Sequence, residues 1–175
     1  MTTYLLDPAH STIGFNVKHM MIAKVYGAFE KVSGKFIYDH SQPEKSSAEA
    51  TIESASINTR EPQRDGHLKS PDFFDVEKFP EITFKSKSIT ASADGELKLN
   101  GELTIKGVTK IVTLDVEGPS AEIKDPFGNL KVGISAITKI KRKDFGLTWN
   151  AALETGGVLV SDDVNIILDL QFVKG

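Results

Sequence analysis

The chain has 175 residues, a formal net charge of -3 and no cysteine. This length fits one domain that can bury a sizeable core, and the lack of cysteine excludes disulfide and thiolate chemistry. Both signs of charge are spread along the chain, without the basic stripe that nucleic-acid binding requires. We therefore expect a single domain over residues 1–175 that binds no nucleic acid.

The N-terminal segment MTTYLLDPAHST has no basic n-region and only two consecutive leucines before Asp7. These features do not fit a secretory signal, and no apolar run approaches the length of a membrane span. We expect a soluble, cytoplasmic domain with no integral membrane segment. A mature exported form with a new Met1 would look the same.

Alternation of apolar residues with period 2 is the dominant signal and starts near the N-terminus. In HSTIGFNVKH, the residues Ile13, Phe15 and Val17 share one face, and His19 is next on that face. This pattern predicts a strand with one apolar face. The following HMMIAKVYG is one of two places where helix is expected, here a turn or two. GAFEKVSGKFIYD and SAEATIESAS then indicate weaker strands.

The second helical place lies in residues 60–79. Pro62 can open a short helix that runs to Lys69, and Arg64, His67 and Leu68 share one of its faces. Gly66 weakens this helix, so packing must hold it in place.

A further helical turn is expected directly after it. Ser70 is a good N-cap, Pro71 sits at the favoured first position and Asp72 adds an acid to the first turn. Pro80 forbids continuation.

Three more weak strands follow, EITFKSKSITA, ELKLNGELTIK and KIVTLDVEG. Two turn signals compete between the first two, Asp94-Gly95 and Asn100-Gly101. We favour Asp94-Gly95 because it leaves full strands on both sides, and Gly101 then marks a bulge or bend inside a strand. Lys106-Gly107 predicts the next turn.

The last two strands, KVGISAITKIK and DVNIILDLQF, show the clearest alternation. One face carries Val132, Ile134, Ala136, Thr138 and Ile140 in the first strand, and Val164, Ile166, Leu168, Leu170 and Phe172 in the second. Between them, KRKDFGL indicates a strand end and turn with Phe145 buried and Arg142 near a rim. ALETGGVL indicates a long hairpin connection.

About eight antiparallel strands form either a sandwich or a closed barrel, and closure removes exposed edges. An eight-stranded barrel is filled by side chains or holds one small ligand. Ala48, Ala50, Ala136 and Thr138 are small for a solid core, which favours a hollow one.

Arg64, Asp65 and His67 are candidates for acid–base chemistry or phosphate handling. However, Asp65 and His67 are two residues apart and do not face each other on a helix. An Arg–carboxylate pair that fastens the helical excursion is the stronger interpretation, and Asp65 can also pair with Lys69. Anion contact by Arg64 or His67 at a barrel mouth stays open.

A metal site is not expected. The four histidines, His10, His19, His40 and His67, show no ligand spacing, whereas metal binding needs several converging ligands. We interpret His19 as a hydrogen-bonded histidine at a strand end.

The stretch FFDVEKFP contributes to a group of four phenylalanines between Phe73 and Phe84. It predicts a hydrophobic lid over one barrel end. An adaptable apolar mouth of aromatic and methionine side chains is compatible with such a lid; its expected members are Met20, Met21, Phe73, Phe74, Phe79 and Trp149.

Four segments resemble, in order, the signatures of the YceI-like, polyisoprenoid-binding proteins: LDPAHSTIGFNVKHMMIAKVYGAF, SINTREPQRDGHLKSPDFFDVEKFPEITFKS, GELTIKGVTKIV and IKRKDFGL. The resemblance implies an all-β, antiparallel, eight-stranded lipocalin-like barrel with a short helical excursion near residues 60–79. It implies an apolar pore that holds a polyisoprenoid, an isoprenoid quinone or a fatty-acid amide. It also implies homodimers, no required cofactor and no established catalysis.

From strand parity and the family motifs we expect the ligand-binding residues to be Phe15, Val17, His19, Met20, Arg64, His67, Phe73, Phe74, Phe84, Phe145 and Trp149. The leading hypothesis is storage, transport or sequestration of a long apolar lipid. Two alternatives stay open: an enzyme that uses His67, Asp65 or Arg142 in the same pocket, and a filled barrel that acts through its surface in stress or interaction.

Overall fold

The computed structural model describes residues 1–91, 96–153 and 158–175. The strands are β1 (Thr2–Leu6), β2 (Thr12–His19), β3 (Ala23–Phe29), β4 (Val32–Tyr38), β5 (Ser47–Glu53), β6 (Ile57–Asn58), β7 (Glu81–Ala91), β8 (Leu97–Ile105), β9 (Val108–Glu117), β10 (Ile123–Lys124), β11 (Leu130–Lys141) and β12 (Asp163–Lys174). One α-helix, α1 (Pro62–Lys69), and four 3-10 turns, η1 (Pro8–His10), η2 (Pro43–Lys45), η3 (Ser54–Ser56) and η4 (Arg142–Phe145), complete the described elements.

Eight antiparallel strands close into a barrel, as the sequence predicts. The ring runs β11-β9-β8-β7-β5-β4-β1-β12, and pairing of β12 with β11 closes it. That last ladder extends from Lys131↔Val173 to Lys141↔Asp163. Closure leaves no long exposed edge in the ring.

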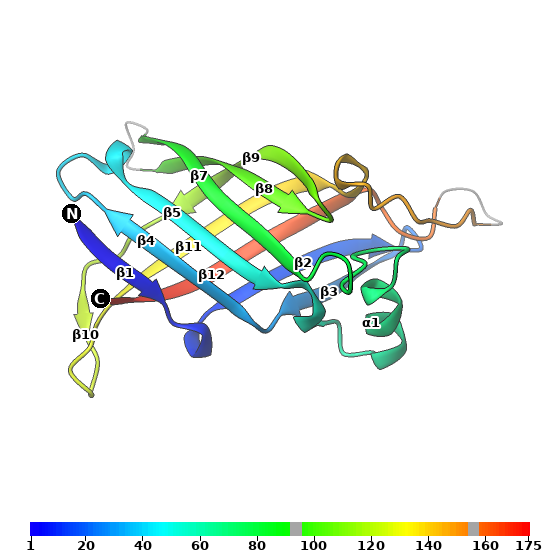
Figure 1. Cartoon of the computed structure of the whole chain (residues 1–175), viewed down its shortest axis with the longest axis horizontal. Coiled ribbons are helices and arrows are strands. Elements are labelled where there is room, and N and C mark those ends of the chain that lie inside the picture. Colours follow the sequence, from blue (N-terminus) through cyan, green and yellow to red (C-terminus); the bar gives the residue numbers. More distant parts are fainter. Residues whose placement is uncertain (92–95, 154–157) are drawn as a thin grey trace.

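The barrel wall is extended at one end by β2 and β3. β1 pairs with the C-terminal part of β12, through Leu6↔Phe172, and β2 pairs with its N-terminal part, through Phe15↔Ile166. The turn η1 bends the chain between the two strands, and the carboxylate of Asp7 caps it by accepting from the Ala9 N–H. Both chain termini lie at the end that carries β10, whereas β2, β3 and α1 reach the other end (Figure 1).

HMMIAKVYG forms no helix, so that prediction is wrong. Its residues make the β2–β3 hairpin, with Val17 opposite Val25, and Ile22 N–H donates to the His19 carbonyl in the turn. These residues form a strand and not a helix because pairing with β2 turns Val25 towards the barrel interior, where it lines the central cavity.

The helix α1 has the predicted bounds, but the second helical turn does not form. Glu61 caps α1 by accepting from the Gln63 and Arg64 N–H groups. Ser70 ends this helix, donating its N–H to the His67 carbonyl, and is not an N-cap. Its own carbonyl accepts from both Phe73 and Asp75, which folds the following residues into tight turns.

The turn and bulge signals are informative where the structure describes them. Lys106 and Gly107 form the predicted turn with φ of 52° and 75°. The predicted irregularity at Gly101 lies opposite a register shift between Ser86 and Ser88 on β7. A side chain at Gly101 would collide with the Phe84 ring, so this glycine allows a close approach. Asp94-Gly95 lies outside the described residues.

Buried apolar side chains form three clusters, of which the smallest contains Leu114, Val116 and Ala136. Tyr4, Phe36, Val132 and Phe172 are buried together in another cluster. The third contains Ile52, Phe73, Ile82, Leu103, Ile105, Phe145 and Leu147. Members of all three clusters border a cavity inside the barrel.

Candidate functional site: an apolar cavity inside the barrel

A cavity of about 560 Å³ occupies the barrel interior. Its lining includes members of the two larger clusters, such as Phe36 and Ile82, so it extends between them. A volume between about 300 and 1,000 Å³ is typical of small-molecule sites. The hollow interior predicted from the sequence is therefore present.

Strand parity correctly predicts most of the apolar wall. Ile13, Phe15 and Val17 from β2 line the cavity, as do Ile82 and Phe84 from β7. The predicted inward faces of the last two strands contribute Ile134, Ala136, Thr138 and Ile140, and Val164, Ile166, Leu168, Leu170 and Phe172.

Small side chains create the empty space. Ala48, Ala50, Ala136 and Thr138 all line the cavity, together with Gly34. Larger residues at these inward positions would fill the barrel, as in a packed core.

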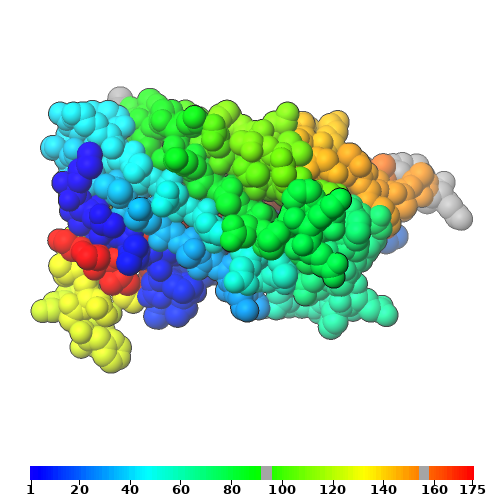
Figure 2. All heavy atoms as spheres, viewed as in Figure 1, coloured from blue at the N-terminus to red at the C-terminus, as the bar shows by residue number. Residues whose placement is uncertain are grey.

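The cavity reaches the surface beside α1. Gln63 is exposed and also lines the cavity. Along β3, only Ala28 and Phe29 pair with β6 among the described residues, so the rest of that edge carries no strand. The segment from α1 to residue 80 covers this side of the barrel in the space-filling view (Figure 2). The predicted lid is thus a helix followed by turns.

Arg64 fastens α1 to the segment before it. Its Nε donates to Thr59 Oγ1 at 2.8 Å and its Nη2 to the Thr59 carbonyl at 2.6 Å. Asp65 accepts from both the N–H and the hydroxyl of Thr59. The predicted Arg–carboxylate and Asp65–Lys69 pairs are therefore replaced by contacts through Thr59, which is buried.

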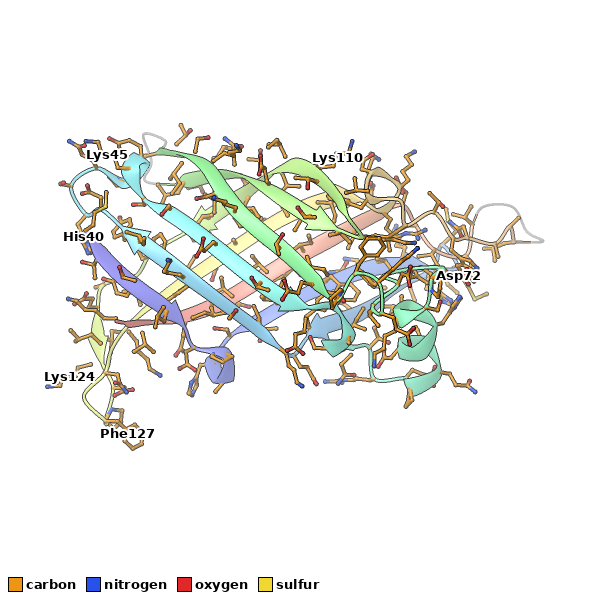
Figure 3. All side chains as sticks on the ribbon, in the orientation of Figure 1. His40, Lys45, Asp72, Lys110, Lys124 and Phe127 are labelled. Atoms are coloured by element: carbon orange, nitrogen blue, oxygen red, sulfur yellow. The ribbon has the colours of Figure 1, made fainter. Side chains whose placement is uncertain are left out.

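His67 pairs with a carboxylate that sequence spacing did not suggest. Its Nε2 lies 2.9 Å from Asp72 Oδ2, and Figure 3 shows Asp72 beside α1. The ring meets Phe73 and Trp149 edge-on, with centroids 5.1 and 4.8 Å apart. Within the described ranges no hydroxyl group is hydrogen-bonded to this ring.

Arg142 directly follows the end of β11, at the predicted strand end, and its side chain is buried. Its guanidinium donates to the carbonyls of Ser161, Leu147, Trp149 and Val160. Burial lowers the pKa of this group, and it lies 5.9 Å from the Phe73 ring centroid. Its bonds hold two separate chain segments together at the cavity wall.

Nine of the predicted ligand-binding residues line the cavity: Phe15, Val17, His19, Arg64, His67, Phe73, Phe74, Phe84 and Trp149. Two do not. Met20 is 44% exposed in the β2–β3 turn, and Phe145 is 1% exposed within a side-chain cluster.

Several lining residues were missed by the sequence prediction, among them Leu6, Leu97, Leu99, Leu103, Leu159 and Val160. The alternation in ELKLNGELTIK would have identified the three from β8, since they share one face.

No group of three or more metal-ligating side chains comes together in the part of the chain that the structure describes. Likewise, no helix within those ranges is long and apolar enough to cross a membrane.

An antiparallel eight-stranded barrel around an apolar cavity defines a hollow, lipocalin-like β-barrel protein. The profile of the YceI-like domain matches residues 4–172. The chain belongs to the YceI-like family.

Relatives match along nearly the whole chain. A UPF0312 protein of Staphylococcus aureus strain N315 is 40% identical over 172 residues, covering 98% of each chain. The crystal structure of Burkholderia cenocepacia BcnA has a TM-score of 0.79 at 28% identity and covers 95% of this chain and 98% of its own. A Campylobacter jejuni YCEI protein has a TM-score of 0.75 at 34% identity, covering 90% of each chain.

A polyisoprenoid binding domain from Saccharophagus degradans shares the fold. Its TM-score is 0.71 at 18% identity, with both chains fully covered.

Proposed function

We propose that this protein binds an elongated apolar lipid inside the barrel and stores, transports or sequesters it without catalysis. The ligand class is a polyisoprenoid, an isoprenoid quinone or a fatty-acid amide. The observation that carries the proposal is the continuous cavity of about 560 Å³, whose wall is apolar along most strands.

Burial of the lipid chain supplies the affinity. Each buried methylene contributes about 0.8 kcal/mol to the binding free energy, so one buried isoprene unit contributes several kcal/mol. Simple addition over many units would exceed realistic affinities, and the cost of ordering the chain offsets much of it. We therefore expect selection by chain length and shape more than by head group.

Polar groups are available for a head group where the cavity opens. Arg64 uses Nε and Nη2 on Thr59, and its Nη1 has no hydrogen bond to the described residues. Gln63 and His67 line the same part of the cavity. A quinone or amide oxygen at this mouth would find donors without breaking the bonds that hold α1.

The comparisons support a binding role. The Saccharophagus degradans domain of the same fold is a polyisoprenoid binding domain, and this chain belongs to the YceI-like family. The enzyme alternative would use His67, Asp65 or Arg142 on a bound substrate. Asp65 is hydrogen-bonded to Thr59 and Arg142 to backbone carbonyls. The observation in favour of this alternative is the 2.9 Å contact between His67 and Asp72.

Lipid recovery separates a carrier from an enzyme. The protein is loaded with a prenyl quinone, incubated, denatured and extracted, and the lipid is analysed by mass spectrometry. A carrier returns the lipid with unchanged mass, and His67→Ala retains most of the uptake. Conversion of the lipid that His67→Ala abolishes would overturn the non-catalytic proposal.

The homodimer and the cytoplasmic location remain predictions from the family resemblance and the N-terminal sequence. Ile137 and Ile167 face each other across β11 and β12, and both are exposed, at 57% and 41%. This apolar pair is a candidate contact for a second copy. Sedimentation velocity measures the mass in solution, and a monomer at all accessible concentrations would contradict the dimer.

A further inference from the structure

The turn between β2 and β3 exposes three consecutive apolar side chains. Met20, Met21 and Ile22 are 44%, 55% and 83% exposed. The tip is fixed in place, because Met20 N–H donates to the Leu159 carbonyl at 2.7 Å and His19 bridges to Val160. We call Met20, Met21 and Ile22 the hairpin tip.

The backbone of the hairpin tip does not favour these residues. Met20 and Met21 have φ of 53° and 64°, the left-handed region that Gly, Asn and Asp adopt most readily. Methionines at these positions therefore weaken the turn and place apolar groups in water. Such local conflict between sequence and fold is expected where a surface has a function.

Two exposed lysines lie directly behind the hairpin tip. Lys18 and Lys24 are opposite each other in the β2–β3 ladder, and both side chains are exposed. Neither has an ion-pair partner among the described residues. The acids of the adjoining segment, Asp162 and Asp163, are in ion pairs with Lys141 and Lys143.

The next outward residue on β3 is Tyr26, which is 62% exposed. Along this hairpin, apolar side chains at the tip are followed by two lysines and then by a tyrosine. Groups of these kinds follow one another in the same order across the interface between lipid and water. The lysines match the negative charge of anionic lipid head groups.

The hairpin tip is continuous with the wall of the cavity. On the same two strands His19 and Val25 turn inward and line the cavity, and Leu159 and Val160, which pair with the tip's backbone, line it too. A surface that seats the tip would therefore lie close to the cavity's contents.

We propose that the hairpin tip docks this protein onto anionic phospholipid bilayers, which deepens and rests on the proposed lipid-binding function. Met20, Met21 and Ile22 enter the head-group region, and Lys18 and Lys24 contact lipid phosphates. Docking in this orientation brings the cavity to the bilayer surface, where its ligand can enter or leave.

Co-sedimentation with vesicles tests the docking. The probes are vesicles of phosphatidylcholine alone and of phosphatidylcholine mixed with phosphatidylglycerol. The wild-type protein is expected to prefer the anionic vesicles. Met21→Asn with Ile22→Ser removes two exposed apolar groups, keeps a residue suited to the left-handed turn, and lowers partitioning roughly tenfold. Lys18→Gln and Lys24→Gln each lower it roughly fivefold on anionic vesicles.

The matched control lies at the other end of the molecule. Phe127 is 89% exposed in the β10–β11 hairpin, at the opposite end of the molecule from Asp72 (Figure 3). Phe127→Ser is expected to leave vesicle binding unchanged. Loss of binding in Phe127→Ser but not in the tip variant would overturn the proposal.

A vesicle-free titration with a prenyl quinone separates the two proposals. Wild-type protein that takes up quinone but does not sediment with either vesicle would overturn docking and leave lipid binding intact. Failure to take up prenyl quinones, polyisoprenoids and long-chain amides alike would overturn the proposed function itself. The tip variant is expected to bind quinone like the wild type while losing vesicle affinity.

Discussion

The indole of Trp149 meets the imidazole of His67 edge-on at the cavity wall, with ring centroids 4.8 Å apart. Phe73 completes the group at 5.4 Å from the indole. All three side chains line the cavity. Since Trp149 is the chain's one tryptophan, its fluorescence reports on this site alone.

Prenyl quinones are therefore expected to quench the emission of Trp149 as they enter the cavity. The quenching should saturate at one ligand per barrel or fewer, because the interior holds a single cavity-sized guest. Steady-state fluorescence titration measures this directly. A linear, unsaturable decrease, equal to that of free tryptophan, would mean that quinone reaches Trp149 only by collision.

Filling part of the cavity should weaken uptake without unfolding the barrel. Ala136 is 4% exposed and lines the cavity, so Ala136→Phe places a ring in the ligand's space. We expect quinone affinity to fall roughly tenfold or more, since displaced methylenes contribute about 0.8 kcal/mol each.

The neighbouring outward position is the control for this change. Ile137 is 57% exposed, and Ile137→Phe should bind quinone like the wild type. Equal affinities for the two variants would place the ligand outside the cavity.

Arg142 is expected to stabilise the wall around Trp149. Arg142→Gln leaves several carbonyls of residues 147–161 without donors, and a buried unsatisfied group costs about 1–3 kcal/mol. Chemical denaturation should therefore show a loss of about 2–4 kcal/mol in the free energy of unfolding, with a red-shifted Trp149 emission in the folded protein.

Lys143→Gln is the matched control for Arg142→Gln. The Lys143 side chain is 64% exposed and lies 3.8 Å from Asp162, and ion pairs of exposed lysines contribute about 0–1 kcal/mol. Similar losses in both variants would contradict the role assigned to Arg142.

The raised pKa of Tyr4 predicts how the free energy of unfolding changes at alkaline pH. Burial and then the hydrogen bond to Glu122 raise the pKa of Tyr4 from 10.0 to about 12. The folded protein thus favours the neutral phenol, so its contribution is fully present below pH 10 and is lost as pH rises through the folded pKa.

Comparison with Tyr4→Phe isolates this contribution, because phenylalanine cannot ionise. Between pH 10 and 12 the free energy of unfolding of the wild type should fall more steeply than that of the variant. Tyr26→Phe controls for loss of an exposed phenol group. Parallel curves for wild type and Tyr4→Phe would show that the Tyr4 hydroxyl is not held in its neutral form.

Strand periodicity predicted the wall because inward and outward residues must alternate in a barrel. Ile13, Phe15 and Val17 follow this rule, as do the inward residues of β11 and β12. This alternation is interrupted where a strand contains a bulge. On β7 the shift between Ser86 and Ser88 lets both Phe84 and Ile89 line the cavity, although they are separated by an odd number of positions.

Contacts between distant segments determine the features that local sequence signals predicted wrongly or did not predict. Ser70 and Pro71 satisfy the rules for starting a helix, yet Ser70 is used to end α1. Met20 resembled a mouth residue, but the turn at that position points it to solvent. The bonds of Arg142 reach residues as far along the chain as Ser161, and no spacing rule anticipates such a contact.

Denaturing extraction of the purified protein, followed by mass spectrometry, tests the lipid-binding account most directly. We predict a co-purifying isoprenoid or other long-chain lipid, near one equivalent or below, whose amount is clearly reduced in Ala136→Phe prepared in the same way. Protein that yields no lipid, and takes none up when offered prenyl quinones or long-chain amides, would contradict the account.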